Sequence, residues 1–188
     1  MLVDATKRLL REMPYAGISV AAILERSGLS TGAFYRHFQS KDELMVSVYR
    51  DNGSVLGALL AERVAAATTP PEALEAWMEE MLRLAFEPRT VQHVALFADA
   101  GLRAAVAEAG VVASTRQLML APLVTALDAG RRDGSLPAAE PRVHAPLILA
   151  MVIDVIEHRG IEGAGRRSGK RATLERLLAF TLRGLGGR

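Results

Sequence analysis

Residues 19–38 decide the fold, and they read SVAAILERSGLSTGAFYRHF. Ser19 is a good N-cap for a short helix, and Gly28 suits the left-handed position that follows a helix end. Ser30 or Thr31 can then cap a second short helix that runs through Phe38. The stretch therefore predicts two helices joined by a glycine turn, which is the arrangement of a helix-turn-helix.

The two faces of this unit differ in composition. One face is apolar and would lock the two helices at a steep angle; its members are Val20, Ile23, Leu24, Leu29, Phe34 and Phe38. The other face of the second helix lets the backbone approach base edges, because its side chains are mostly small; its members are Ser30, Thr31, Gly32, Ala33, Tyr35, Arg36 and His37. Helix N-termini at Ser19, Ser30 and Ser40 attract phosphate, and Lys41 adds a positive charge. We therefore predict a DNA-binding unit.

Helical patterns cover the rest of the chain. Apolar residues at helical spacing predict a first helix of about three turns that ends at Pro14. Ser40 and Glu43 form a capping box that opens a long fourth helix towards Ala67, and similar start signals recur at Thr69. Further patterns predict helices over residues 71–86, 90–110, 114–133, 141–159 and 171–185, with a loop over residues 160–170.

These patterns predict an all-α chain of two parts. Residues 1–48 would form an N-terminal three-helix helix-turn-helix DNA-binding domain. The long fourth helix would join it to residues 49–188, a C-terminal helical bundle for effector binding and dimerisation. A chain of 188 residues, of which 50% are hydrophobic and 5% aromatic, can bury the core that such a fold needs.

Charge is distributed unevenly along the chain. Residues 1–50 carry seven Lys/Arg and five Asp/Glu. Residues 51–158 carry eight Lys/Arg and fourteen Asp/Glu, and residues 159–188 carry eight Lys/Arg and two Asp/Glu. Two basic ends therefore flank an acidic middle. A basic end can bind phosphates or an anionic membrane surface, or it can serve solubility alone. Charge does not distinguish these roles, so the function has to be inferred from a sequence motif.

The N-terminal quarter of the chain resembles the TetR family of transcriptional regulators. The residues that carry the resemblance are Leu9, Leu10, Tyr15, Gly17, Ile18, Ser19, Val20, Ile23, Ser27, Gly28, Leu29, Ser30, Gly32, Phe34, Tyr35, His37, Phe38, Ser40, Lys41 and Leu44. They follow the family signature nearly position by position, further than a generic helix-turn-helix would. Pro14 stands where the family usually has glycine, and the first helix of family members usually starts a turn or more earlier.

The resemblance implies a homodimeric, sequence-specific regulator of transcription. By position it places Ser19, Tyr35, His37 and Lys41 against phosphates, and Thr31, Ala33 and Arg36 near base edges. It implies a near-palindromic double-stranded operator, because two recognition helices about 34–36 Å apart reach successive major grooves. It also implies repression that ends when a small-molecule effector changes the separation of the two heads. Activation is the open alternative.

Large, adaptable side chains in the C-terminal part form a candidate effector pocket: Trp77, Met78, Met81, Phe86, His93, Phe97, Met119 and Met151. For each single residue, the alternative is plain core packing, the commoner origin of a helical apolar stripe. Pro122 and Pro146 interrupt helical patterns and predict kinks that would open a cavity between the helices.

The last two helical patterns are apolar on more than one side, so a second surface has to be covered. In the TetR family these two helices form a four-helix dimer interface. We therefore expect a homodimer held by Met151, Val152, Val155, Leu174, Leu178 and Leu182.

Other functions find less support in the residues. We expect no enzyme, no cofactor and no metal site. Asp154 and His158 lie one helical turn apart, as metal ligands can, but no third ligand follows at a readable spacing. Residues 163–170 are similar to a phosphate-binding loop, yet Ala164 stands where its first glycine is required and Arg171 where Ser/Thr is required. A ligand-binding or protein-interaction module of the same fold, without DNA function, remains as the alternative.

The chain is expected to act in the cytoplasm without a membrane partner. It contains no cysteine, which fits a reducing compartment. Charged residues close behind Met1 argue against a signal peptide, and the longest apolar run, residues 147–153, is too short to span a bilayer. The basic residues of the 160–171 segment are expected to be solvated, with an acidic ligand or partner as the alternative.

Overall fold

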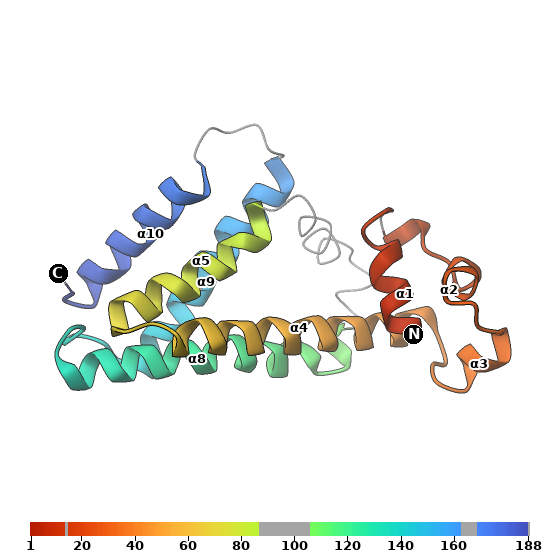
Figure 1. The fold of residues 1–188 in the computed structure, drawn as a ribbon, viewed down its shortest axis with the longest axis horizontal. Coiled ribbons are helices and arrows are strands. Elements are labelled where there is room, and N and C mark those ends of the chain that lie inside the picture. The colour runs from red at the N-terminus through yellow and green to blue at the C-terminus, as the bar shows by residue number, and fades with distance from the viewer. Residues whose placement is uncertain (14, 87–105, 163–168, 188) are drawn as a thin grey trace.

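The computed structural model describes residues 1–13, 15–86, 106–162 and 169–187, with the backbone alone at residues 84, 85 and 158–162. Every element in these ranges is a helix, which confirms the predicted all-α class (Figure 1). In chain order the elements are α1 (Leu2–Leu9), the 3-10 helix η1 (Tyr15–Gly17), α2 (Val20–Ser27), α3 (Thr31–Tyr35), α4 (Lys41–Ala65), α5 (Pro70–Phe86), α8 (Val111–Asp133), α9 (Pro141–Glu162) and α10 (Lys170–Gly184).

The helix-turn-helix begins and ends where its capping residues predict. The Ser19 hydroxyl oxygen accepts a hydrogen bond from the Ala22 N–H at 3.1 Å, and that of Ser30 accepts one from the Ala33 N–H at 3.2 Å. Between these caps, Gly28 has a φ of 67°, a left-handed conformation that glycine adopts without a steric penalty. These local bonds fix the starts of α2 and α3.

Helix α4 connects the N-terminal head, formed by α1, α2 and α3, to the C-terminal body (Figure 1). Its 25 residues span about 37 Å at 1.5 Å per residue. The Glu43 N–H donates to the Ser40 hydroxyl oxygen at 3.1 Å. The Glu43 carboxylate accepts instead from the Gln39 N–H at 2.6 Å, one residue before the expected partner. The predicted long fourth helix is therefore present, with a modified capping box.

Two clusters of buried apolar side chains lie at the two ends of α4. The head cluster contains Ile23 and Phe34, both completely buried, together with the first turns of α4. Val106 and Val111, from the second half of the chain, also join this cluster. The body cluster begins at Leu60 on α4 and unites α5, α8, α9 and α10.

Helix α5 starts with a complete capping box. The Thr69 hydroxyl oxygen accepts from the Glu72 N–H at 3.3 Å, and the Glu72 carboxylate accepts from the Thr69 N–H at 3.3 Å. This reciprocal pair is the one that the sequence predicts. It fixes the direction in which the chain turns from α4 into α5.

Several predicted helix bounds are corrected. The first helix ends at Leu9 rather than near Met13, because tighter turns follow, such as the bond from the Arg11 N–H to the Arg8 oxygen. The recognition helix α3 ends at Tyr35 rather than Phe38. Helix α8 begins three residues early, after a left-handed Gly110, and α9 continues to Glu162, so residues 160–162 are helical and not loop. Of the helix predicted over residues 90–110, residues 90–105 lie outside the described part.

Helices α8 and α9 stay helical through Pro122 and Pro146. A proline inside a helix removes one backbone N–H from the hydrogen-bond ladder. The kinks and the cavity expected from these prolines therefore stay predictions. Within the described residues, no helix is long and apolar enough to cross a membrane.

Candidate nucleic-acid interface and effector region

The recognition helix α3 buries one side chain and exposes most of the others. Phe34 is completely buried in the head, whereas Tyr35 is 57% exposed. The residues predicted to contact DNA lie mostly at the surface: Ser19, Ser30, Thr31, Gly32, Tyr35, Arg36 and His37 are exposed, and Ala33 and Lys41 are half-buried. Their burial pattern brings a polar, solvent-facing surface together around α3. This surface has the composition that a DNA-reading face requires.

An aromatic cluster fixes the direction of Tyr35. The Phe34 and Tyr35 rings meet edge to face, with centroids 5.2 Å apart and planes 79° apart. Phe38 packs against Phe34 at 6.0 Å between centroids, although it lies beyond the end of α3. Such aromatic pairs are stabilising beyond the area that they bury. The phenol of Tyr35 is therefore presented to solvent from a fixed base.

Lys41 has two partners inside the head. Its ammonium group donates to the Ile18 carbonyl oxygen at 3.1 Å and lies 4.0 Å from the centroid of the Tyr15 ring. The Tyr15 hydroxyl in turn donates to the Asp42 carboxylate. These contacts join the first turn of α4 to the start of α2. An ammonium group has three donors, so a phosphate contact at Lys41 is compatible with this bond and stays a prediction.

Two ion pairs hold α1 and the turn that follows it, and neither was predicted from the sequence. Arg26 on α2 binds Glu12 through two parallel hydrogen bonds of 2.6 Å each. Hydrogen bonding to Arg26 lowers the pKa of the Glu12 carboxyl, and the same bond raises the pKa of Arg26. Lys7 pairs with Asp51 on α4. Partners so far apart in the chain carry no periodic signal, so sequence patterns could not reveal them.

Each serine that caps a helix in the head still has a hydroxyl proton that it can donate to DNA. Ser19, Ser30 and Ser40 each accept a backbone N–H with the hydroxyl oxygen. A hydroxyl that accepts in this way still has its own proton to donate. The capping role observed here and the phosphate role expected for Ser19 are therefore compatible.

The predicted effector residues lie mainly in the body core. Trp77, Met78 and Met81 are at most 1% exposed, and the Trp77 indole N–H donates to the Met119 carbonyl oxygen at 2.9 Å. Phe86, Met119 and Met151 pack against the same core and are partly buried. His93 and Phe97 lie outside the described residues. In this conformation, therefore, Trp77, Met78 and Met81 fill core space.

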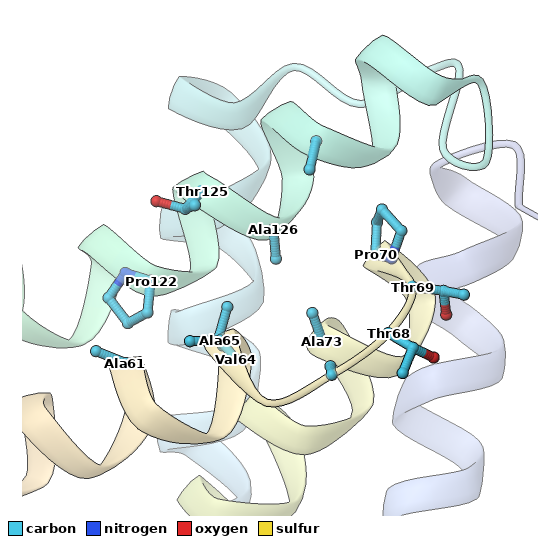
Figure 2. Close-up of a pocket in the computed structure, with 12 residues that line it drawn as sticks. Ala61, Val64, Ala65, Thr68, Thr69, Pro70, Ala73, Pro122, Thr125 and Ala126 are labelled. Atoms are coloured by element: carbon cyan, nitrogen blue, oxygen red, sulfur yellow. The ribbon is translucent and has the colours of Figure 1, made fainter.

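An open groove lies at the far end of α4, where the chain turns into α5 (Figure 2). It has a volume of about 350 Å³ and is lined mostly by small side chains from α4, α5, the turn between them and α8. Its lining residues are Ala61, Val64, Ala65, Ala67, Thr68, Thr69, Pro70, Ala73, Pro122, Thr125, Ala126 and Ala129. None of the predicted effector residues is among them, so this groove is not the pocket expected from the sequence.

The predicted dimer residues differ in exposure. Val152 is completely buried in the body core and Leu174 is 6% exposed. Met151, Val155, Leu178 and Leu182 are partly buried. Among the described side chains of the same two helices, three large apolar ones outside the predicted dimer set are exposed: Val143, Leu147 and Phe180, at 52%, 61% and 65%.

A buried carboxylate links α4 and α5. Glu80 is 4% exposed and lies 2.6 Å from the Arg83 guanidinium and 3.6 Å from that of Arg63 on α4. A buried charge is tolerated only when it is paired, as Glu80 is here. The sequence pattern of α5 gave no sign that this carboxylate, among several on the helix, is buried.

Two basic residues at the start of α10 pair with carboxylates of the same chain. Lys170 lies 3.0 Å from Glu79 on α5, and Arg171 lies 2.8 Å from Glu175. Arg166 and Arg167 lie outside the described residues. The partners found for Lys170 and Arg171 are therefore carboxylates of the chain itself.

Of the two candidate metal ligands, Asp154 and His158, the structure describes the side chain of only one. Asp154 is exposed on α9, whereas the side chain of His158 lies outside the described ones. Among the side chains that are described, no group of three or more His, Asp or Glu could hold a metal ion. The prediction that there is no metal site stays a prediction.

A helix-turn-helix that buries Phe34 and presents Tyr35, Arg36 and His37 defines a class, the DNA-binding regulators of transcription. Residues 2–48 match the family model described as bacterial regulatory proteins, tetR family. This N-terminal part is a DNA-binding domain of the tetR family, as its signature predicts, and it supports a DNA-binding transcriptional regulator. No curated protein sequence matches the chain.

Solved structures of regulators share the fold along almost the whole chain. FadR from Bacillus subtilis, in complex with stearoyl-CoA, has a TM-score of 0.75 at 16% identity, covering 97% of each chain. FadR from Bacillus halodurans, described as a fatty acid degradation regulator, has a TM-score of 0.76 at 17% identity, covering 100% of this chain and 95% of its own. NemR from E. coli in its reduced form has a TM-score of 0.70 at 21% identity, covering 97% and 94%. These proteins and the family are regulators and not enzymes.

Proposed function

We propose that the chain is a homodimeric repressor that binds a near-palindromic operator and leaves it when a small-molecule effector binds the body. One observation carries the proposal: α4 is a single helix that is held by the head at its start and by the body from its midpoint onwards. At its start, Lys41 is bound to the Ile18 carbonyl oxygen in the head. Further along, Gly53 and Gly57 lie in close contact with Thr115 and Leu118 of α8 in the body. A shift of α8 would therefore move the head.

The dimer is proposed from the apolar surface of α9 and α10. Leu147 and Phe180 expose 61% and 65% of their surface, a costly arrangement for a single chain in water. Pairing α9 and α10 of two protomers in a four-helix interface would cover both residues. It would also place two recognition helices at the separation that successive major grooves require, about 34–36 Å.

The effector is proposed to bind within the body. The core of α5, α8, α9 and α10 contains Trp77, Met78 and Met81, and methionine side chains adapt readily to a ligand. Among proteins of this fold, FadR from Bacillus subtilis was solved in complex with stearoyl-CoA, so this fold occurs in a regulator that binds a small molecule. We propose for this chain a small molecule that displaces part of that packing, and we leave its identity open.

The two parts of the chain would then have separate tasks. Residues 1–48 would form the DNA-binding domain and residues 49–188 the effector-binding and dimerisation domain, with the boundary inside α4. The two buried clusters at opposite ends of α4 support this division. A DNA partner in a bacterial regulator also supports a cytoplasmic location.

The first experiment measures binding of the purified protein to duplexes from the region upstream of its own gene, over a series of salt concentrations. A Tyr35→Ala, Lys41→Ala variant removes two proposed phosphate contacts, and Arg131→Ala, an exposed cation of the body, is the matched control. The proposal predicts tight binding that weakens steeply with salt, because phosphate contacts release counterions. The control should bind normally and the double variant poorly.

Three results would contradict parts of the proposal. Equal loss in the double variant and the control would show that the surface around α3 is not the binding face. A monomer at micromolar concentration would contradict the dimer. A reporter gene behind the bound duplex that becomes more active when the protein is present would show activation and not repression.

A further inference from the structure

Tyr15 is a buried residue of the head with two contacts that reach the first turn of α4. It lies in the 3-10 helix η1 and is 9% exposed. The face of its ring lies under the Lys41 ammonium group, 4.0 Å from the centroid, and its hydroxyl donates to the Asp42 carboxylate. One side chain therefore binds two neighbouring residues of opposite charge. Core packing would need the ring but neither of these contacts.

The contacts of Lys41 determine where its ammonium group lies. A lysine side chain is long and flexible, and in water it samples many rotamers. Here the ammonium group is held between the Tyr15 ring and the Ile18 carbonyl oxygen, which accepts from it at 3.1 Å. Ile18 directly precedes Ser19, whose hydroxyl oxygen caps α2. The positive charge is therefore placed beside the start of α2, where the helix N-terminus also attracts phosphate.

The hydroxyl of Tyr15 acts on the opposite charge. Asp42 follows Lys41 in the chain and is exposed in the first turn of α4. An unbound carboxylate at this place would repel a phosphate and compete with it for the ammonium group. The bond from the Tyr15 hydroxyl gives the carboxylate a partner of its own. The ammonium group has three donors, so it keeps one for a further acceptor.

We propose that Tyr15 is a positioning residue for DNA binding: its ring holds the Lys41 ammonium group ready for a phosphate, and its hydroxyl keeps the Asp42 carboxylate away from both. The inference rests on the proposed function, because it concerns the phosphate contact expected of Lys41. Immobilising a flexible side chain costs free energy when a complex forms, and a side chain that is already held has less freedom to lose. Tyr15 therefore raises the affinity for DNA without contacting DNA.

Two variants of Tyr15 isolate the contribution of the ring. Tyr15→Phe and Tyr15→Leu both lack the hydroxyl, so the difference between them measures the ring alone. Tyr15→Leu should bind the duplex that the wild-type protein selects from a randomised pool about fivefold more weakly than Tyr15→Phe, the size expected when a lysine has to be ordered on binding. In a Lys41→Ala background this difference should disappear, because no ammonium group is left to position.

The hydroxyl is tested with Tyr15→Phe and Asp42→Asn. Tyr15→Phe alone should weaken binding by about threefold, the usual effect of one exposed charge. In an Asp42→Asn background the same change should have little effect, because the side chain at position 42 is then uncharged. Tyr15→Phe keeps the buried ring, so this cycle tests the proposal even where Tyr15→Leu does not fold.

Tyr49→Leu is the matched control for loss of a ring from the head. Tyr49 lies on α4 and packs against the same buried cluster as Tyr15. Circular dichroism first establishes a temperature at which every variant is folded. At that temperature Tyr49→Leu should bind the selected duplex as tightly as the wild type, because it leaves the contacts of Lys41 in place.

The inference is overturned if Tyr15→Phe binds as tightly as the wild type, or if the difference between Tyr15→Phe and Tyr15→Leu is the same with and without Lys41. A loss in Tyr49→Leu as large as that in Tyr15→Leu would show that affinity follows the stability of the head, and would also overturn it. Failure of the wild-type protein to select any duplex would overturn the proposed function, and this inference with it. The two proposals therefore fail in different ways.

Discussion

Gly57 on α4 lies so close to Leu118 on α8 that a Cβ added to the glycine would be 2.8 Å from the Leu118 Cβ and 3.3 Å from its carbonyl oxygen. One turn earlier, a Cβ on Gly53 would be 2.5 Å from the Thr115 Cγ2. Both glycines are buried in the contact between the two helices. The absence of side chains at these positions therefore sets the distance between α4 and α8.

Gly57→Ala should destabilise the protein by about 1–3 kcal/mol, the usual cost of overfilling a packed contact. The neighbouring atoms belong to the Leu118 Cβ and backbone, which move only if α8 moves. Chemical unfolding followed by circular dichroism measures the change. A variant as stable as the wild type would show that α4 and α8 can separate at little cost. Gly53→Ala should also destabilise the protein, and adding Thr115→Ala should restore part of the lost stability. The reason is that the atoms closest to the new methyl group belong to the Thr115 side chain, which the second change shortens.

Trp77→Phe should destabilise the protein by about 1–3 kcal/mol. It removes the hydrogen bond to the Met119 carbonyl oxygen and leaves space where the larger ring was. Because Trp77 is the only tryptophan of the chain, unfolding has to be followed by circular dichroism and not by fluorescence. Unchanged stability would mean that the bond between α5 and α8 contributes nothing.

Glu12→Gln should destabilise the head at neutral pH, and the difference from the wild type should disappear in acid. The bond from Arg26 lowers the pKa of the Glu12 carboxyl from its ordinary 4.5. The carboxylate therefore stabilises the folded state fully above pH 4.5, and this stabilisation is lost as the pH falls through the lowered pKa. Thermal midpoints of both proteins across this pH range test the prediction. Glu75→Gln, at an exposed carboxylate on α5, is the control.

Phe180→Arg should give a folded monomer. The side chain is 65% exposed in the single chain, so the change costs the protomer little, but an interface would have to bury the charge. Sedimentation measures the mass, and DNA binding should be lost together with the dimer. Val55→Arg is the control, because Val55 is also apolar and 60% exposed but lies on α4. If both variants remain dimers, the interface lies elsewhere.

The head was the most predictable part of the chain because its signals are local. A cap such as Ser19 binds an N–H three residues away, so the sequence itself brings the partners together. The same holds for the buried position of Phe34, which follows from helical spacing. The role of Lys41 is different. Its bond to the Ile18 carbonyl oxygen joins residues 23 positions apart, which no periodicity reveals.

For the body, the sequence predicted the helices but not which side of each helix is buried. Val152 and Leu147 lie on the same helix and are both apolar, yet one is completely buried and the other is 61% exposed. A helix that is apolar on several sides does not itself indicate which side its neighbours cover. The effector residues pose the same difficulty, since Trp77 was expected to line a pocket and here packs into the core.

By itself the sequence determined the all-helical class, the helix starts marked by Ser19, Ser30, Ser40 and Thr69, the helix-turn-helix and its resemblance to the tetR family, because capping bonds and helical periodicity act within a few residues. Only the tertiary structure decided how α4 is held by the head and by the body, and which described apolar side chains of α9 and α10 remain exposed. These features depend on which distant segments meet. That choice rests on the packing of whole helices, not on any local pattern.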